Sequence, residues 1–192
     1  VVGESGSGKT TLSAMLLRFI EPSSGSYYLG GVNARDIPGD EIRRMVGLCA
    51  QDAHIFDSTI RENLRLARPD CDDNALRDAL RRVRLLDWVQ QLPGGLDTQV
   101  GEGGRRLSEG ERRRISVARV LLADFPAIVF DEPTANLDQP TADALVRDLL
   151  AATSDRATLL ITHRLSALEL VDEIIVLKDG GVAERGTHDH LI

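Results

Sequence analysis

The sequence predicts an α/β fold in which a mostly parallel central sheet carries an inserted helical subdomain. Two observations predict this. Short apolar runs typical of buried strands alternate with helical patterns along the chain. A long helical stretch, from about residue 59 to residue 123, separates the early strands from the late ones. The 192 residues, 42% hydrophobic and 28% charged, are enough for one globular domain with its own core.

The expected elements before the helical stretch follow from local patterns. They are the end of a strand at Val1 and Val2, a helix from Thr10 to Ile20 closed by Pro22, a hairpin from Ser26 to Ala34 that turns at Gly30 and Gly31, and a strand from Met45 to Ala50.

Within the helical stretch, Asp72 is expected as an N-cap that opens an amphipathic segment. Its apolar stripe consists of Leu76, Leu80, Val83, Leu86 and Val89. Later in the chain we expect a helix over residues 109–123, buried strands over 127–130 and 158–161, and strands over 174–177 and 182–184 around the turn Asp179-Gly180-Gly181.

The segment Gly3-Glu4-Ser5-Gly6-Ser7-Gly8-Lys9-Thr10 fits the phosphate-binding pattern G-x-x-x-x-G-K-[ST]. Its glycines let the backbone curl so that N–H groups point at a polyphosphate. Lys9 brings a cation to the β and γ phosphates, and the Thr10 hydroxyl is a ligand for Mg²⁺. Taken alone, the segment also fits a Gly/Ser-rich turn before an amphipathic helix.

A second element of the same chemistry follows the apolar run from Ala127 to Phe130. That strand delivers Asp131 and Glu132 to its carboxyl end, where open α/β sheets bind ligands. Asp131 is placed to hold Mg²⁺ through its water shell, and Glu132 to polarise an attacking water. An acidic strand end leading into a turn at Pro133 is the plainer interpretation of this segment by itself. Together, the two elements predict a P-loop nucleotide-binding core.

The bulk properties argue against a nucleic-acid-binding role and indicate the redox compartment. A net charge of -7 argues against a general nucleic-acid binder, which needs a basic face. The run Arg112-Arg113-Arg114 is accordingly expected to be a solvated helix face. Cys49 and Cys71 have no metal-ligand spacing and indicate a reducing compartment. His54, His188 and His190 are expected to be exposed and are given no role.

Five segments follow the phosphate loop in a fixed order: Gln51, Leu107-Ser108-Glu109-Gly110-Glu111, Asp131-Glu132, Ala135-Asn136-Leu137-Asp138, and His163. This succession resembles the nucleotide-binding domain of an ABC transporter over nearly the whole chain. The resemblance implies ATP as the nucleotide and Mg²⁺ as the cofactor. The ATP-binding residues that it implies are Gly3, Glu4, Ser5, Gly6, Ser7, Gly8, Lys9, Thr10, Thr11 and Gln51, and the Mg²⁺ ligands are Thr10, Gln51 and Asp131.

The resemblance also implies the roles of single residues. Glu132 would be the general base, and His163 would contact the γ-phosphate and hold the water. Gln51 would couple Mg²⁺ to the helical subdomain, and Asp138 would signal to a second subunit. By residue type alone, Gln51 fits a surface glutamine, Asp138 an N-cap before Pro140, and His163 a polar loop residue.

The partner that the resemblance implies is a second nucleotide-binding domain, arranged head to tail with two ATP molecules in the interface. Leu107 to Glu111 form the signature, whose Ser108 and backbone N–H groups near Gly110 would grip the partner's γ-phosphate. Ser108 and Glu111 also fit a capping box, which needs no ligand.

The signature departs from the family pattern, which usually has Gly at the place of Glu109 and often has Gln at the place of Glu111. A carboxylate at Glu109 repels a triphosphate unless its side chain turns away. We therefore expect the ATP site that uses this signature to be the weaker one. Changing Glu109→Gly is then expected to raise turnover in the assembled dimer.

Within the family, residues 51–64 resemble the segment that lies beneath the membrane domain of exporters, and Gly101-Glu102 resembles the loop that touches their coupling helices. Residues 50–69 and 110–114 most resemble the C-type (CydC-like) subunit of the bacterial thiol-reductant exporter. That subunit works as a heterodimer linked to cytochrome bd assembly, with cysteine and glutathione as cargo. The implied location is the cytoplasmic face of the bacterial inner membrane.

The chain opens inside a strand and without an initiator Met, so we expect it to be an N-terminally truncated piece of a longer polypeptide. The expected organisation is a partial ATP-binding domain over 1–192, with a helical subdomain at about 52–123. The adenine-stacking aromatic residue and a fused transmembrane domain would lie upstream. Three alternatives remain: a soluble ABC-type ATPase in DNA repair or translation, a module that binds ATP without hydrolysing it, and an exporter of lipid, peptide or drug cargo.

Overall fold

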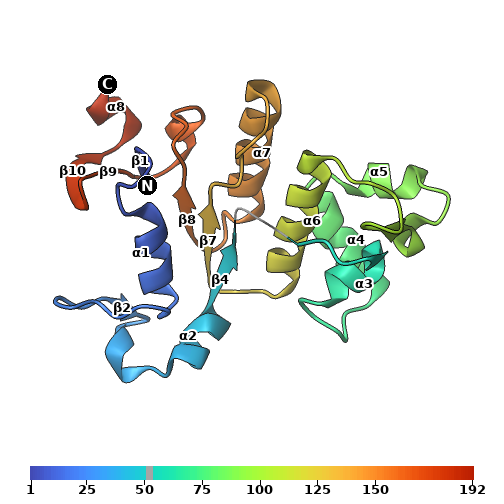
Figure 1. The fold of residues 1–192 in the computed structure, drawn as a ribbon, viewed down its shortest axis with the longest axis horizontal. Helices are drawn as coiled ribbons and strands as arrows, with labels where there is room; N and C mark the ends of the chain where they lie inside the picture. The colour runs from blue at the N-terminus through green and yellow to red at the C-terminus, as the bar shows by residue number, and fades with distance from the viewer. Residues whose placement is uncertain (51–53) are drawn as a thin grey trace. The chain divides into compact units, whose positions relative to one another are not determined.

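The computed structural model describes residues 1–50 and 54–192, and these fall into two compact units (Figure 1). The first unit comprises Val1–Leu48, Phe125–Glu132 and Arg156–Ile192. The second comprises Cys49–Asp124 and Pro133–Asp155, as far as these residues are described. In the described residues, no helix is both long and apolar enough to cross a membrane.

The first unit is an α/β unit. Its strands are β1 (Val2–Gly3), β2 (Tyr28–Leu29), β3 (Val32–Asn33), β4 (Val46–Cys49, of which the last residue belongs to the second unit), β7 (Ala127–Asp131), β8 (Ala157–Ile161), β9 (Ile174–Lys178) and β10 (Gly181–Gly186). Its helices are α1 (Lys9–Leu16), α2 (Gly39–Met45) and α8 (His188–Leu191), with 3-10 turns at Ala34–Asp36 and Leu168–Leu170.

Two three-stranded sheets, β4-β7-β8 and β1-β9-β10, meet at the carboxyl end of β8. The pairs β7–β8 and β1–β9 are parallel, whereas β9–β10 is antiparallel. A parallel bridge between Val2 and Thr162 joins the two sheets, and the Thr162 amide donates to the Val1 carbonyl at 3.0 Å. The ends of β1, β7 and β8 therefore lie together at one edge.

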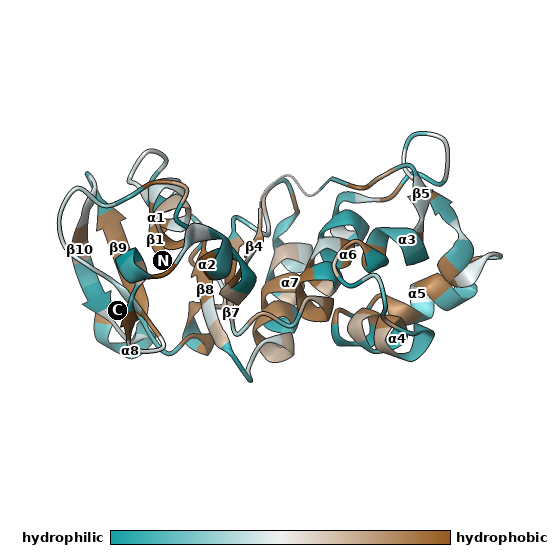
Figure 2. Cartoon of the chain, turned by 90° about the horizontal axis from the view of Figure 1, so that it is seen from below, coloured by the Kyte–Doolittle hydropathy of each residue, from teal (hydrophilic) through white to brown (hydrophobic). Residues whose placement is uncertain are grey.

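The predicted buried strands β7 and β8 are largely apolar (Figure 2). The core that they help to form consists of Leu17, Ala34, Ile42, Val46, Val129 and Ile161. Helix α1 contacts β7, which fixes the phosphate loop at the helix start relative to the acidic end of that strand.

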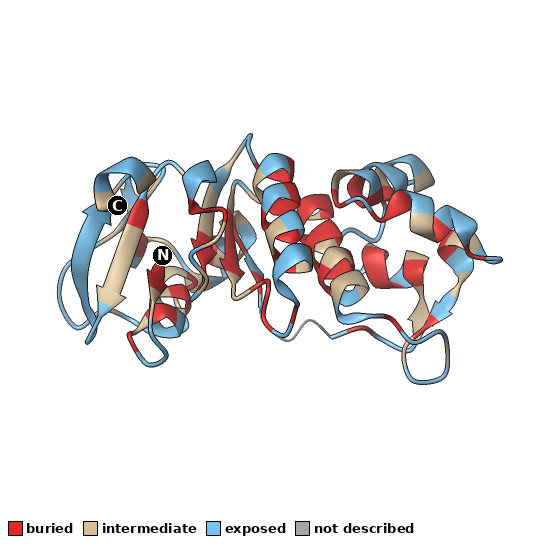
Figure 3. Ribbon diagram, turned by 90° about the horizontal axis from the view of Figure 1, so that it is seen from above, coloured by how far each residue is buried: buried red, intermediate tan, exposed pale blue. Residues whose placement is uncertain are grey.

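The second unit is mainly helical. Its elements are α3 (Ile60–Arg65), α4 (Asp73–Arg82), α5 (Leu86–Gln91), α6 (Glu109–Leu122) and α7 (Gln139–Ala152), with short strands β5 (Ser58–Thr59) and β6 (Gln99–Val100) and a 3-10 turn at Gly95–Asp97. Strands β5 and β6 pair antiparallel. Helix α6 packs against α3, α4 and α7, and its buried face is visible along most of its length (Figure 3).

Several local predictions are confirmed. Asp72 caps α4, where its side chain accepts a hydrogen bond from the Ala75 amide at 2.8 Å. All five residues of the predicted apolar stripe are buried. The hairpin at Gly30-Gly31 is present. The helix expected over 10–20 is shorter and ends at Leu16, because Arg18 has a left-handed backbone with φ of 55°.

The prediction of a solvated arginine face at residues 112–114 is wrong. Arg112 is exposed, but Arg113 is buried and the Arg114 side chain is only 16% exposed. Arg114 donates to the Val83 carbonyl at 2.6 Å and to Asp148 at 2.8 Å. Charge density alone does not reveal that two of these side chains lie on the packed side of α6.

Candidate nucleotide site

The loop between β1 and α1 has the backbone that phosphate binding requires. Gly8 caps α1 in a left-handed conformation with φ of 103°, which a residue with a side chain adopts only with strain. Gly3 is needed for a different reason. A Cβ atom there would lie 2.4 Å from the Leu177 carbonyl oxygen of the neighbouring strand. The loop can therefore curl tightly against the sheet.

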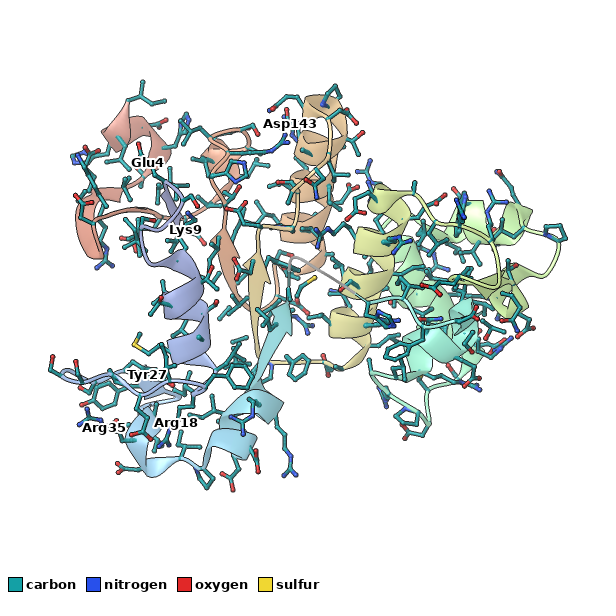
Figure 4. All side chains as sticks on the ribbon, in the orientation of Figure 1. Glu4, Lys9, Arg18, Tyr27, Arg35 and Asp143 are labelled. Carbon is teal, nitrogen blue, oxygen red and sulfur yellow. The ribbon has the colours of Figure 1, made fainter. Side chains whose placement is uncertain are left out.

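Lys9 and Ser7 supply the polar groups inside this loop. The Lys9 side chain is held over the loop, where its Nζ donates to the carbonyl oxygens of Gly3 at 2.7 Å and Glu4 at 2.8 Å (Figure 4). The buried Ser7 Oγ has no hydrogen-bond partner among the described atoms. A buried cation beside an unsatisfied hydroxyl suits an anionic ligand with several acceptor oxygens.

Asp131 lies at the end of β7 and faces the phosphate-loop helix. One of its oxygens, Oδ2, accepts a hydrogen bond from Ser13 Oγ of α1 at 3.3 Å. Burial raises the pKa of this carboxyl, the nearby Glu132 raises it further, and Ser13 and Lys9 partly oppose the shift. A partly buried carboxylate whose ionised form is disfavoured in this way suits a bound divalent cation. Thr10, which is exposed, lies in the first turn of the same helix α1.

Glu132 and His163 meet next to this carboxylate. The Glu132 amide donates to the Ile161 carbonyl at 2.9 Å, which ties it to the end of β8. Glu132 has a left-handed backbone with φ of 49°, which is uncommon for a residue with a side chain. Its Oε2 lies 2.8 Å from Nδ1 of His163. Because an ionised carboxylate only accepts, Nδ1 of His163 is the donor.

This pair leaves one imidazole nitrogen for a further ligand. His163 Nε2 makes no part of the contact with Glu132, and the His163 side chain is 56% exposed. The Glu132 side chain, by contrast, is 15% exposed. The arrangement can orient a water beside a carboxylate base while the histidine contacts a second group.

The first unit thus contains the whole predicted phosphate loop, from Gly3 to Thr11, together with Asp131, Glu132 and His163. Gln51 lies outside the described residues. The signature and Asp138 belong to the second unit, which is described by itself. Sequence analysis did not identify Ser13, although it lies four residues after Lys9 and so on the same face of the helix.

The signature opens helix α6 through a capping box. The Glu111 amide donates to Ser108 Oγ at 3.3 Å, and the Ser108 amide donates to Glu111 Oε2 at 2.7 Å. Leu107 is buried just before the cap. Asp138 caps α7 in a similar way, by accepting from the Thr141 amide at 3.1 Å. The N-cap interpretation of Asp138 is therefore confirmed, whereas its signalling role stays a prediction.

The fold and this site together define a P-loop ATPase domain. A parallel sheet positions a glycine-rich loop, its lysine, and an acidic strand end at one edge. The hydrogen-bonded carboxylate and histidine next to them are groups that can activate water.

Comparison with known proteins gives the family. The family model described as "ABC transporter" matches residues 1–135. The chain is 38% identical over its whole length to the ATP-dependent lipid A-core flippase of Desulfotalea psychrophila, and 42% identical to the mitochondrial iron-sulfur clusters transporter ABCB7 of Homo sapiens. It spans 34% and 26% of the lengths of these two curated relatives.

A solved structure agrees with this result. The structure titled "Structure of a bacterial Atm1-family ABC exporter with ATP bound" is 36% identical and superposes with a TM-score of 0.88, over 99% of this chain and 33% of the other. The chain therefore belongs to the ABC transporter family, and its fold is that of the family's ATPase domain.

Proposed function

We propose that the chain is the ATP-hydrolysing motor of an ABC exporter. In this proposal it binds MgATP at the phosphate loop, closes against a second nucleotide-binding domain, and drives an attached transmembrane domain. The observation that carries the proposal is the 2.8 Å contact between Glu132 and His163. A carboxylate held by a histidine at the strand edge that also carries the phosphate loop is suited to activating water for attack on a γ-phosphate.

Each residue of the site has a distinct task in this proposal. The loop amides from Gly3 to Thr11 and the Lys9 ammonium bind the β and γ phosphates. Glu132 accepts a proton from the attacking water, and His163 holds Glu132 and contacts the γ-phosphate. Mg²⁺, when held by Thr10, Asp131 and Gln51, neutralises charge on the phosphates.

The partner's nucleotide is bound by the signature in this proposal. Ser108 Oγ and the amides near Gly110 contact the second ATP, and Asp138 links the two sites. We favour a heterodimer, with the transmembrane domain in the same full-length chain and the motor on the cytoplasmic face of a bacterial inner membrane. The proposed organisation is a partial ATP-binding domain over 1–192, with its helical subdomain at about 52–123.

The finer proposal concerns the cargo. The likeness of residues 50–69 and 110–114 to a thiol-reductant exporter supports cysteine or glutathione. The relatives that match the chain carry other cargoes in their names, namely lipid A-core and iron-sulfur clusters. Uptake of labelled cysteine and glutathione into inverted membrane vesicles, compared with flipping of a labelled lipid, separates these cargoes. Transport of the lipid alone would remove the thiol proposal.

The motor proposal is tested with Glu132→Gln in the full-length protein. Loss of the base is expected to lower ATP turnover by a factor on the order of 10² or more, while nucleotide binding is retained. A nucleotide-bound dimer should then accumulate in size-exclusion chromatography with ATP. The matched control is Glu184→Gln, because Glu184 is exposed on β10.

Two results would contradict the proposal. Hydrolysis that persists in Glu132→Gln would show that the base is another group. Nucleotide binding that persists in Lys9→Ala would show that the phosphates do not bind at the loop. Sequencing upstream of Val1 adds an independent check, since a block of apolar spans of about 20 residues each is expected there.

A further inference from the structure

The first turn of helix α6 carries two carboxylates at the place where the proposed function requires an anion to bind. Glu109 and Glu111 both lie within this turn. Acidic side chains stabilise a helix N-terminus, but they also compete there with an anionic ligand. The position of each carboxylate therefore decides whether the helix start attracts or repels a phosphate.

The carboxylate of Glu111 is directed back onto the chain. Its Oε2 accepts from the Ser108 amide at 2.7 Å within the capping box. A glutamine side chain also has an oxygen that can accept this bond, so the departure at Glu111 keeps the cap intact.

Glu109 is held by a different group, the guanidinium of Arg113. Glu109 Oε1 lies 3.4 Å from Arg113 Nε, one turn further along the helix. Glu before Arg at this spacing is the favourable order for an ion pair on a helix. The two partners differ in burial, because the side chain of Arg113 is 2% exposed and that of Glu109 is 42% exposed.

Arg113 is also fixed at a second point. Its Nη1 donates to the Ala50 carbonyl oxygen at 3.2 Å. A buried guanidinium is costly unless a negative charge and hydrogen-bond acceptors compensate it. Ala50 supplies an acceptor for Nη1, whereas Nε makes no hydrogen bond to the described atoms. Glu109 therefore compensates the guanidinium through its charge, and this attraction keeps the carboxylate beside Arg113.

We propose that Arg113 is a positioning residue of the signature: it holds the Glu109 carboxylate along the side of α6, so that the start of this helix can accept the partner's triphosphate. The same side chain anchors the signature helix to the backbone immediately before Gln51. This inference rests on the proposed function, because the anion is the ATP of that function. The sequence alone predicts that Glu109 repels the triphosphate; in this inference its ion pair with Arg113 removes that repulsion.

The neighbouring arginines provide matched comparisons. Arg112 is exposed on the same helix, and Arg114 pairs with Asp148. Of these three arginines, Arg113 is the one paired with Glu109, so its loss is the change that releases this carboxylate. The change Arg112→Gln removes one positive charge at the adjacent position without touching that pair, so it is the control for net charge.

The test is a set of variants in the full-length protein: Arg113→Gln, Glu109→Gln, the double variant and Arg112→Gln. With Arg113→Gln the freed carboxylate opposes the triphosphate, and KM for MgATP is expected to rise about fivefold, with a much smaller change in kcat. The double variant should return KM to within about twofold of the wild type. Arg112→Gln should leave KM unchanged.

A second readout does not depend on nucleotide. Without ATP, each single change leaves one member of the pair uncompensated, so both should lower Tm. The double variant should lower Tm by less than the sum of the two. If Arg113→Gln yields too little folded protein, Arg113→Lys keeps the cation near Glu109 and should hold KM within about twofold of the wild type.

The outcomes separate this inference from the function on which it rests. If the wild type hydrolyses ATP and Arg113→Gln leaves KM unchanged, or the double variant does not restore it, Arg113 is structural only and the inference is wrong. A Glu109→Gly variant with raised turnover would also overturn it. If the wild type hydrolyses no ATP, the function itself fails, whereas the Tm coupling still reports the ion pair.

Discussion

Removal of the Asp148 carboxylate is expected to destabilise the second unit strongly. Asp148 lies on α7, and its side chain is 3% exposed. Its two oxygens pair with different arginines: Oδ1 lies 2.7 Å from Arg84 Nε, and Oδ2 lies 2.8 Å from Arg114 Nη1. This carboxylate therefore joins the signature helix α6 to helix α7.

The size of the effect follows from what each arginine retains. The Arg114 side chain is 16% exposed in the structure. After Asp148→Ala it keeps the Val83 carbonyl as an acceptor but loses its counter-charge. Leaving a buried charge unpaired costs about 3–5 kcal/mol of unfolding free energy. Arg84 is 76% exposed, so water compensates its charge when Asp148 is removed. The change Arg84→Ala leaves Asp148 paired with Arg114 and should cost less than about 1 kcal/mol. At roughly 2–4 °C per kcal/mol, Asp148→Ala lowers Tm by about 6–20 °C.

The assay is urea unfolding of the purified protein, followed by circular dichroism, with the midpoint and the m-value fitted separately. The control is Asp78→Ala, which removes an exposed carboxylate from its pair with Arg81 on α4 and should cost under about 0.5 kcal/mol. If Asp148→Ala shifts the midpoint no more than Asp78→Ala does, the burial argument is refuted. An Arg84→Ala variant as unstable as Asp148→Ala would refute the ranking.

Three further predictions concern single positions. Gly101→Ala should destabilise the protein by at least about 2 kcal/mol in a thermal melt, because φ is 107° and the new Cβ would lie 2.7 Å from Asp57 Cα. The control Gly25→Ala has a φ of 79° but open space around the new Cβ, and it should cost about 1 kcal/mol. Equal costs for the two changes would contradict the clash at Gly101. Burial raises the pKa of Asp131, so the native protein binds this proton more tightly than the unfolded chain does, and it loses stability as pH rises above about 3.9. Asp131→Asn should therefore raise the free energy of unfolding of the nucleotide-free protein at pH 7 by less than about 1 kcal/mol, measured by urea unfolding. A gain that persists below about pH 3.9 would contradict this cause. Burial also raises the pKa of the Cys49 thiol. Cys49 should therefore react with a thiol reagent at pH 8 only as fast as the protein unfolds, which mass spectrometry of the labelled peptide measures. Labelling at the rate of a free thiol would contradict its burial.

Most of the elements could be predicted because their signals are local. The run Ala127 to Phe130 is apolar enough to be recognised as a buried strand, and the structure has β7 there. The cap at Asp72 and the box at Ser108 depend on residues three positions apart. Such patterns need no knowledge of the rest of the fold.

The contact between Glu132 and His163 could be inferred only indirectly. They are 31 residues apart, and the parallel register of β7 with β8 brings the two strand ends together. Composition and periodicity contain no information about that register. The resemblance to a family supplied the pairing instead, through the position of each residue in an ordered series of motifs.

The arginine run shows where sequence reasoning fails for a physical reason. Residues 112–114 are three identical charges in a row, yet their environments differ because successive residues of a helix point about 100° apart. Arg112 is exposed, Arg113 is buried beside Glu109, and Arg114 binds Asp148. A charge run is a property of the sequence, whereas burial depends on which neighbours pack against each face.

The two segments of the second unit that the proposed function assigns to the dimer begin at the caps of α6 and α7. Ser108 caps the first helix and Asp138 caps the second. The buried pair of Arg114 and Asp148 connects these helices away from their caps. A change that loosens this pair should therefore disturb both segments at once, although neither Arg114 nor Asp148 is proposed to touch nucleotide. Stability and ATP turnover should fall together in Asp148 variants, whereas Arg113 variants should change KM far more than kcat. This contrast separates a residue that holds two helices together from one that holds a single carboxylate.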